Sequence, residues 1–325
     1  MSLLSDRGKR RLILWPTAVL PQGPRVALRA KMMAAHELGK ASRAPFLVIA
    51  HPKSGNTWLR TMLSRYYAKK YGLSGSLVFK SDELHRQDGR IPNFFFSNGH
   101  YSYERVIAAA LDGTGPGRGV VGKPVMFIAR HPCDQAVSWF HQFTKRTSEP
   151  KVELIQATLK TPIDRKRIEM WDFVRHSEIG LPMLIDYLNE WYRRVSVLEG
   201  SLILRYEDMR TQPRETLVKV LDFMGETRDD ALIDDAVAYG DFDNLKRLEA
   251  AGTFTRGGLK LVDPDDPTTR KVRRGKIGGF RDDFPPEKAD ELEALVAERL
   301  DPGLGYGVAG GDGEVPAATA GAAEG

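Results

Sequence analysis

Short apolar runs alternate along this chain with segments of helical periodicity. The run at 46–50, Phe-Leu-Val-Ile-Ala, has a β-branched centre and ends at the turn-forming sequence His-Pro-Lys-Ser-Gly, as expected of a strand buried on both faces. Comparable runs occur at 94–96, 125–129 and 202–204, and each is followed by turn or polar residues and then by a helical pattern. This alternation predicts a three-layer α/β fold with a central, mainly parallel β-sheet flanked by helices.

The segment after the first strand has a clear helical pattern. Between 56 and 71 apolar residues recur at helical spacing, so 46–71 is predicted to form a strand, a tight glycine turn and a helix. Pro132 and Pro213 stand where the first residue of a helix is expected, and Gly225 ends the second of these helices. The other helical patterns lie at 134–143, 150–198, 215–224, 228–250 and 286–300.

Charge divides the chain into three parts. The 325 residues contain 48 Lys and Arg against 43 Asp and Glu, but residues 1–45 alone carry nine basic and two acidic side chains. We interpret 1–45 as a basic, partly apolar extension that lies on an anionic membrane surface or packs on the domain. Residues 46–300 are expected to form one domain. Residues 301–325 are rich in Gly and Ala and are expected to be disordered.

The single cysteine, Cys133, excludes an internal disulfide and any site that needs several cysteines. The chain therefore suits a reducing compartment, and we expect a cytoplasmic protein, with peripheral contact at the inner face of the membrane as an option through 1–45. No apolar run reaches 18 residues, and the stretch 12–20, which superficially resembles part of a signal peptide, is broken by Pro16.

The turn after the first strand suits an anion. Backbone N–H groups of a glycine turn that opens a helix point at one spot together with the positive end of the helix. Lys53 adds a mobile cation, and the Ser54 and Thr57 hydroxyls add hydrogen-bond donors. An ordinary strand-to-helix turn with a solvent-facing lysine is the alternative. The turn lacks the Gly-x-x-x-x-Gly-Lys-Ser/Thr pattern, and Arg130 rather than an acid follows 125–129, so a nucleoside triphosphatase or kinase is disfavoured.

The turn sequence Pro-Lys-Ser-Gly-Asn-Thr-Trp resembles the 5′-phosphosulfate loop of sulfotransferases of the cytosolic and bacterial type, which use 3′-phosphoadenosine 5′-phosphosulfate (PAPS). This family has a P-loop-containing fold and transfers a sulfuryl group from PAPS to an acceptor. Asn56 stands where the family usually has Thr. The resemblance implies that the 5′-phosphosulfate is bound by Lys53, Ser54, Gly55, Asn56, Thr57 and Trp58.

Two later segments resemble the family's 3′-phosphate site. In Ile-Ala-Arg-His-Pro-Cys-Asp-Gln-Ala-Val-Ser, Arg130 at a strand end and Ser138 eight residues on match its phosphate ligands. The guanidinium fork of Arg130 suits a phosphate monoester. The sequence Arg-Arg-Gly-Lys-Ile-Gly-Gly-Phe-Arg resembles the late basic signature, in which Arg273, Arg274 and the Gly275 amide would close over the phosphate. Departures at 274 and 279–281, above all Gly279 for Asp, leave the shape of this turn open.

Aromatic residues in three segments match the family's adenine site. Trp58, Tyr206 in Tyr-Glu-Asp-Met and Phe242 in Asp-Phe-Asp-Asn-Leu-Lys correspond to its ring partners. Stacking on aromatic rings recognises the flat face of a purine. Each of these aromatics taken alone is better explained by core packing.

Sulfuryl transfer needs a base for the acceptor and a cation for the leaving phosphate. The resemblance places the base at His100 and makes Lys53 the stabilising cation, with Ser138 also expected to hold Lys53 before the acceptor binds. The family's usual lysine is replaced by Asn98, so one supporting cation is absent from that position. His51, beside the phosphate turn, is the rival base. No metal is required.

The acceptor is less constrained by the sequence. The segments 73–99, 141–180 and 251–272 are expected to line its pocket and contain aromatic residues among many charges, which favours an apolar or amphipathic hydroxyl or amine acceptor, with a lipid-like alcohol as the first expectation. The alternatives are a P-loop small-molecule kinase and a non-catalytic nucleotide-fold scaffold at a membrane surface. Nucleic acid is not expected as a partner, because no basic stripe with interleaved aromatics is present.

Overall fold

The computed structural model describes residues 12–13, 16–73, 82–97, 103–254, 259–266, 269–272 and 274–306. Within these residues, a parallel sheet of four strands lies at the centre, in the order β2-β1-β3-β4. The strands are β1 (Leu47–Ala50), β2 (Phe95–Phe96), β3 (Val125–Ala129) and β4 (Leu202–Arg205). All four were predicted, and the pairs β1–β2, β1–β3 and β3–β4 are each parallel.

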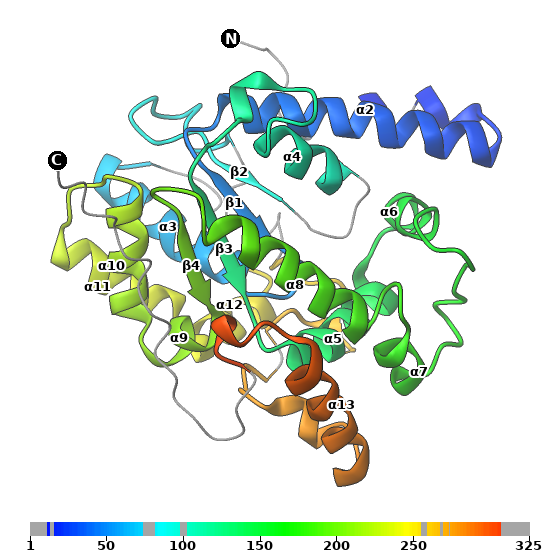
Figure 1. Cartoon of the computed structure of the whole chain (residues 1–325). Coiled ribbons are helices and arrows are strands. Elements are labelled where there is room, and N and C mark those ends of the chain that lie inside the picture. Colours follow the sequence, from blue (N-terminus) through cyan, green and yellow to red (C-terminus); the bar gives the residue numbers. More distant parts are fainter. Residues whose placement is uncertain are drawn as a thin grey trace, which may run out of the picture.

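Burial on both faces explains why the strands are apolar without alternation. In β1, Leu47 and Ile49 belong to one hydrophobic core, whereas Val48 and Ala50 belong to a second core on the other face. The first core packs against α4, α5, α8 and α13, and the second against α3, α9, α10 and α11. The expected three-layer arrangement is therefore present, with α8 lying over the face of the sheet turned to the viewer in Figure 1.

The helices connect these strands in chain order. They are α2 (Gln22–Arg43), α3 (Asn56–Tyr71), α4 (Tyr103–Leu111), α5 (Pro132–His141), α6 (Glu149–Gln156), α7 (Met170–Arg175), α8 (Leu181–Val195), α9 (Tyr206–Thr211), α10 (Pro213–Phe223), α11 (Asp230–Gly240), α12 (Phe242–Ala250) and α13 (Pro286–Arg299). A π-helix, Gln142–Arg146, continues α5. Short 3-10 turns lie at Pro16–Val19, Arg118–Val120, Gly279–Asp282 and Pro302–Leu304. Within the described residues, no helix is long and apolar enough to span a membrane.

The two long helical patterns are interrupted in the structure. The pattern at 150–198 is divided into α6, α7 and α8. The break between α7 and α8 lies at Gly180, where the chain turns so tightly that a Cβ atom would collide with the carbonyl oxygen of Val174. The pattern at 228–250 breaks at Asp241, whose carboxylate accepts hydrogen bonds from the backbone N–H groups of Asp243 and Asn244 and so starts α12. Periodicity alone does not locate such breaks.

The parallel sheet gathers the ends of its strands at one edge. Ala50, Ile128 and Leu204 are register partners, so the turn after β1, Arg130 after β3 and Tyr206 after β4 emerge side by side. Open α/β sheets bind ligands at this carboxyl edge. The register therefore positions the sequence motifs for a common site.

The C-terminal boundary needs a correction, because the disordered tail was expected to begin at residue 301. Residues 302–304 form a 3-10 turn, and Leu304 and Tyr306 are buried at 1% and 8% exposure. The Tyr306 hydroxyl donates to Oε2 of Glu207 at 2.6 Å. Two apolar side chains thus fix this stretch on the domain, and residues 307–325 lie outside the described part of the chain.

Candidate active site

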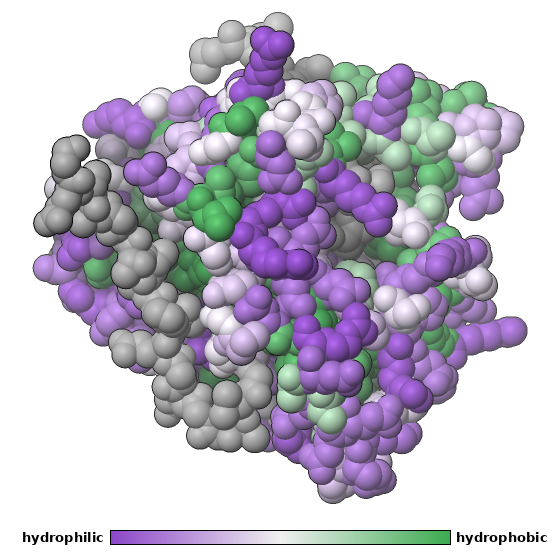
Figure 2. All heavy atoms as spheres, in the orientation of Figure 1, coloured by the Kyte–Doolittle hydropathy of each residue, from purple (hydrophilic) through white to green (hydrophobic). Residues whose placement is uncertain are grey.

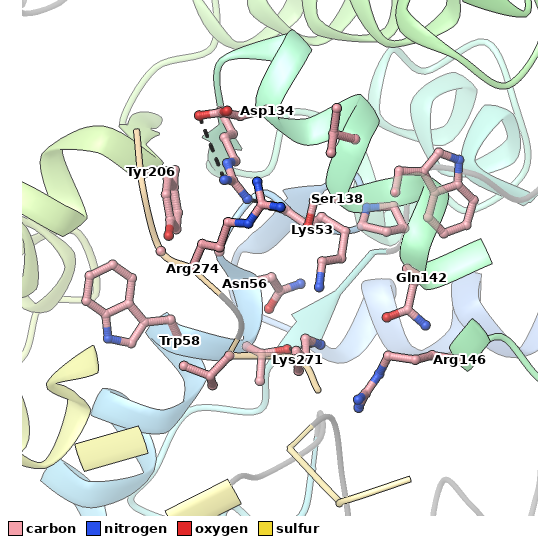
Figure 3. Close-up of a pocket in the computed structure, with 18 of the residues that line it drawn as sticks. Lys53, Asn56, Trp58, Asp134, Ser138, Gln142, Arg146, Tyr206, Lys271 and Arg274 are labelled. Atoms are coloured by element: carbon pink, nitrogen blue, oxygen red, sulfur yellow. Dashed lines mark hydrogen bonds and ion pairs between the residues drawn. The ribbon is translucent and has the colours of Figure 1, made fainter. Parts of the chain in front are cut away.

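A cavity of about 460 Å³ opens at the carboxyl edge of the sheet. Its walls come from the turn between β1 and α3, from α5 and its π-helical extension, from the starts of α9 and α12, and from the segment 271–283. Figure 3 shows the side chains of these elements pointing into a common space. Most of the residues that the sequence motifs single out line this cavity: Lys53, Gly55, Asn56, Thr57, Trp58, Arg130, Ser138, Tyr206, Phe242, Arg274 and Gly275.

The turn after β1 has two residues with left-handed backbone, Lys53 at φ 76° and Gly55 at φ 101°. A left-handed lysine is unusual, because its Cβ atom crowds the following carbonyl oxygen. At Gly55 an added Cβ atom would lie 2.6 Å from Cε of Met209 and 2.8 Å from Cδ2 of Tyr206. This conformation starts α3 directly behind the turn, as an amide cradle for an anion requires.

Ser54 differs from its neighbours in the turn. It is fully buried, it does not line the cavity, and its hydroxyl donates to the carbonyl oxygen of His51 at 3.0 Å. The structure therefore gives Ser54 a role in shaping the turn, whereas the sequence motif suggested a hydroxyl donor to the ligand.

Arg130 joins the turn to the rest of the site. Its Nη1 donates to the carbonyl oxygen of Lys53 at 3.0 Å, and its guanidinium lies 4.2 Å from the centre of the Tyr206 ring.

Asp134, one helical turn further on, is 3.9 Å from Nη2 of Arg130. The Asp134 carboxylate also accepts hydrogen bonds from the backbone N–H groups of Gly278 and Phe280, at 2.8 and 2.9 Å. Asp134 therefore fixes the late glycine turn, whose shape the sequence left open at Gly279.

The aromatic residues form one group at this end of the cavity. The rings of Trp58 and Tyr206 meet edge to face with centroids 5.9 Å apart, and Nε1 of Trp58 donates to the carbonyl oxygen of Gly240 at 2.6 Å. The Phe242 ring lies against Gly275, where any Cβ atom would collide with it. Gly275 has φ 60°, so both its backbone and its lack of a side chain are used here.

The late basic segment is only partly described. Arg274 lines the cavity, but its two terminal nitrogens each lie 2.9 Å from a carboxylate oxygen of Asp283. Arg273 lies outside the described residues. The same is true of His100 and Asn98, so the expected base has no structural description.

The structure describes the residues that flank the His100 segment, Ser97 and Glu104, and also the rival base, His51. Ser97 and Glu104 are buried on either side of that segment, and burial raises the pKa of Glu104 to about 8. His51 is 1% exposed, packs edge to face on the rings of Trp139 and Tyr187, and has its pKa lowered to about 3 by burial. At neutral pH His51 is uncharged and a weak base.

Several cations in the cavity were not singled out from the sequence. The Nζ atom of Lys271 donates to Oγ1 of Thr57 at 2.6 Å, and burial lowers the Lys271 pKa to about 7. Arg60, Arg146 and Lys151 line the same region. The only sequence signal for Lys271 is its position two residues before the basic motif at 273–275. Arg60 similarly lies two residues after the turn motif ends at Trp58, whereas Arg146 and Lys151 come from segments without a motif.

Comparison with known proteins gives the family. The profile of the sulfotransferase domain matches residues 124–302, which is more than half of the chain. Cytosolic sulfotransferase 13 of Arabidopsis thaliana is 24% identical over 280 residues, covering 80% of this chain and 78% of the relative. Flavonol 3-sulfotransferase of Flaveria bidentis is 22% identical over 288 residues, covering 82% and 85%.

Two solved structures share the fold. Mouse sulfotransferase SULT7A1 complexed with PAP aligns with a TM-score of 0.52 at 16% identity, covering 83% of this chain and 92% of the other. Retinol dehydratase in complex with androsterone and the inactive cofactor PAP aligns with a TM-score of 0.50 at 17% identity, covering 84% and 86%. The sequence motifs, the parallel sheet and the profile match agree, and the chain belongs to the PAPS-dependent sulfotransferase family.

Proposed function

We propose that this enzyme transfers a sulfuryl group from PAPS to a hydroxyl or amine of an acceptor. The observation that carries the proposal is the pairing of two anion positions at one edge of the sheet. The first is the left-handed turn at Lys53 and Gly55, and the second is Arg130 with Ser138 on the neighbouring strand and helix. PAPS has a phosphosulfate and a separate 3′-phosphate, whereas ATP has no second anion of this kind. The related structures that contain PAP, the product of sulfuryl transfer, support the same assignment.

We propose a set of nucleotide contacts that the positions of the described cavity residues support. Backbone N–H groups of the turn, with Lys53, Asn56 and Thr57, bind the 5′-phosphosulfate. Arg130 and Ser138 bind the 3′-phosphate, and Arg273, Arg274 and Gly275 close over it. Trp58, Tyr206 and Phe242 contact the adenine. Ser54 acts indirectly, through its hydrogen bond within the turn.

The chemistry is an in-line displacement at sulfur. The acceptor oxygen or nitrogen forms a bond to sulfur while the bond from sulfur to the bridging phosphate oxygen breaks, and the acceptor proton passes to His100. Lys53 stabilises the negative charge that develops on the leaving phosphate. His51 is a poor alternative base, since burial lowers its pKa to about 3. Ser138 and Lys53 face the same cavity, in keeping with a contact between them before the acceptor binds (Figure 3).

We propose an amphipathic alcohol, such as a lipid-like molecule, as the acceptor. Trp139, Leu259 and Val262 give the cavity an apolar wall, and the structural relative retinol dehydratase was solved with androsterone. The N-terminal part offers a place for membrane contact at the inner face of a cytoplasmic membrane. Leu28 and Met32 on α2 are 40% and 37% exposed, and Figure 2 shows hydrophobic surface over α2 and its neighbours.

The decisive experiment first compares the binding of PAP and MgATP and then measures the rate of sulfuryl transfer. Saturable binding of PAP without magnesium, together with no binding of MgATP, is expected and would exclude the kinase alternative. Release of PAP from PAPS with a panel of alcohols and amines measures transfer, and His100→Ala is expected to abolish it while PAP still binds. Undiminished turnover by His100→Ala removes His100 as the base. PAP binding without transfer to any acceptor supports the scaffold alternative.

A further inference from the structure

The cavity extends well beyond the phosphate turn. Ser138, Gln142 and Arg146 follow one another at intervals of four residues along α5 and its π-helical extension, and all three line the cavity. Arg146 therefore lies about two helical turns further along than Ser138. Figure 3 shows Arg146 at the opposite end from Tyr206 and Trp58, with Lys53 and Asn56 between them.

The far part of the cavity is lined by cations from separate segments of the chain. We call this the cationic end, and its members are Arg60, Arg146, Lys151, Lys260 and Lys271. The acidic residues that line the described cavity are Asp134 and Asp283, and both are bound to groups at the nucleotide end. Positive charge therefore exceeds negative charge most strongly at the cationic end.

One buried carboxylate lies behind this end but does not face the cavity. Glu249 is fully buried and accepts hydrogen bonds from the backbone N–H groups of Lys271 and Val272, at 2.7 and 2.8 Å. Its Oε1 atom is also 3.6 Å from Nη1 of Arg146. Glu249 thus fixes the segment that carries Lys271 and compensates part of the charge from behind. The Arg146 guanidinium also donates to the carbonyl oxygens of Thr269 and Lys260, which hold it in place at the cavity wall.

Burial lowers the pKa of two of these cations, Lys271 and Arg146. Burial, together with the nearby positive charges of Arg146 and Arg60, lowers the pKa of Lys271 to about 7. Burial also lowers the pKa of Arg146. Cations that face one another in a partly desolvated cavity are stabilised when an anion binds between them.

The nucleotide accounts for Lys271, which hydrogen-bonds Thr57 of the proposed phosphosulfate turn, but not for the other members of the cationic end. Its anions already have Lys53 and the turn amides at one position and Arg130 with Ser138 at the other. Arg60 instead lies with its guanidinium 5.1 Å from the centre of the Phe96 ring, at the end of β2 just before the segment that carries His100. The cationic end therefore adjoins the end of β2, after which the sequence continues to His100.

We propose that the cationic end binds an anionic group on the acceptor, so that the substrate is an amphipathic alcohol that already carries a carboxylate, phosphate or sulfate. This inference rests on the proposed function and narrows its acceptor class. The anionic group would lie among Arg60, Arg146 and Lys151, the apolar body against Trp139 and Leu259, and the hydroxyl toward the sulfuryl group.

The first test uses inorganic phosphate as the probe on the full-length, PAP-saturated protein. Because PAP fills the nucleotide end, phosphate is expected to bind in one saturable step, measured by calorimetry. The double variant Lys151→Gln/Lys260→Gln alters two exposed side chains and is expected to weaken this binding at least tenfold. Lys160→Gln, an exposed lysine outside the cavity, is the matched control and is expected to leave it unchanged. No phosphate binding by the wild type, or equal binding by the double variant, overturns the inference.

The second test compares 12-hydroxydodecanoate with its methyl ester as acceptors. The carboxylate is expected to have a kcat/KM at least tenfold above that of the ester, and the double variant is expected to bring the ratio close to one. A ratio near one in the wild type overturns the inference even if transfer occurs, so the proposed function survives that result. If the wild type does not bind PAP, the proposed function is overturned instead. The cationic end is then tested separately, by comparing phosphate binding to the PAP-free wild type, the double variant and Lys160→Gln.

Discussion

The protonation of Lys271 depends on whether an anion is bound at the site, at pH values near neutral. Burial lowers its pKa to about 7, and its Nζ atom donates to Oγ1 of Thr57 on the proposed phosphosulfate turn. An anion bound at this turn favours the charged form, so PAP binding at pH 8 is expected to take up a proton. Calorimetry in two buffers of different ionisation enthalpy measures this uptake. Lys271→Met should abolish it, whereas Lys276→Met, which removes another lysine of the cavity, should retain it; uptake that persists in Lys271→Met contradicts the prediction.

Glu104 makes stability depend on pH in the opposite sense from an ordinary surface carboxylate. Burial raises its pKa from 4.5 to about 8, so the folded protein holds this proton between those values while the unfolded chain releases it. The contribution to stability is therefore complete below about pH 4.5 and is lost as pH rises toward 8, by at most about 1.4 kcal/mol per pH unit.

The variant Glu104→Gln isolates this effect. Urea unfolding of both proteins at several pH values between 5 and 9 gives their difference in unfolding free energy. That difference is expected to shift in favour of Glu104→Gln as pH rises, while His51 and Lys271, which also titrate abnormally, contribute equally to both proteins. A difference that does not change with pH would show that Glu104 titrates normally.

Single residues of the site were predictable where they follow a strand of the sheet. Arg130 and Tyr206 come directly after β3 and β4, and Lys53 lies in the turn three residues after the end of β1. A parallel sheet necessarily brings these positions to one edge. Lys271 and Arg146 were not predictable in this way, because they reach the cavity from a loop and a π-helix whose paths depend on tertiary packing. The side-chain direction of Ser54 likewise depends on the turn's three-dimensional shape.

At the scale of elements, the phosphate turn can be tested through its glycine. Gly55→Ala places a methyl group 2.6 Å from Cε of Met209 and 2.8 Å from Cδ2 of Tyr206, so the Tyr206 ring must move. We expect PAP affinity to fall at least tenfold. Gly72→Ala at the other end of α3 is the matched control, since Gly72 also has a positive φ, 63°, but no atom lies within 4 Å of its added Cβ.

Both glycine variants incur a backbone cost of about 1–2 kcal/mol in unfolding free energy, because alanine disfavours the left-handed region. Only Gly55→Ala should also bind PAP more weakly. Calorimetry measures the PAP affinity of both variants under conditions in which the same fraction of each protein is folded. Equal PAP affinities in the two variants would mean that the position of Tyr206 does not matter for the nucleotide.

Helices and strands were predictable from the sequence where the burial of apolar side chains alone determines them. The four strands and the helix at 56–71 follow from continuous or periodic apolar residues, and the structure confirms them. The breaks at Gly180 and Asp241 depend on a backbone collision and a capping carboxylate, which periodicity does not register. Residues 301–306 pack through only two apolar side chains, Leu304 and Tyr306, too few to indicate order in a Gly-rich segment.

At the scale of the whole molecule, the N-terminal helix is connected to the acceptor side of the cavity. Arg25 and Arg29 of α2 both donate to the carboxylate of Glu153 on α6, and α6 also carries Lys151 of the cationic end. In Figure 1, α2 crosses one end of the molecule and reaches toward α6. Residues of the N-terminal helix thus hold the helix that carries one wall of the site.

Glu153→Ala tests this connection. It leaves two partly buried guanidinium groups without their shared carboxylate, so the unfolding free energy is expected to fall by about 1–3 kcal/mol. Because α6 then loses its anchor while the sheet edge is untouched, the acceptor KM should rise with little change in PAP affinity. Glu149→Ala is the control on the same helix; its carboxylate is 74% exposed, so its loss should cost about 0–1 kcal/mol and leave KM unchanged. Equal acceptor KM values in the two variants would show that α2 stabilises the fold without positioning the acceptor wall.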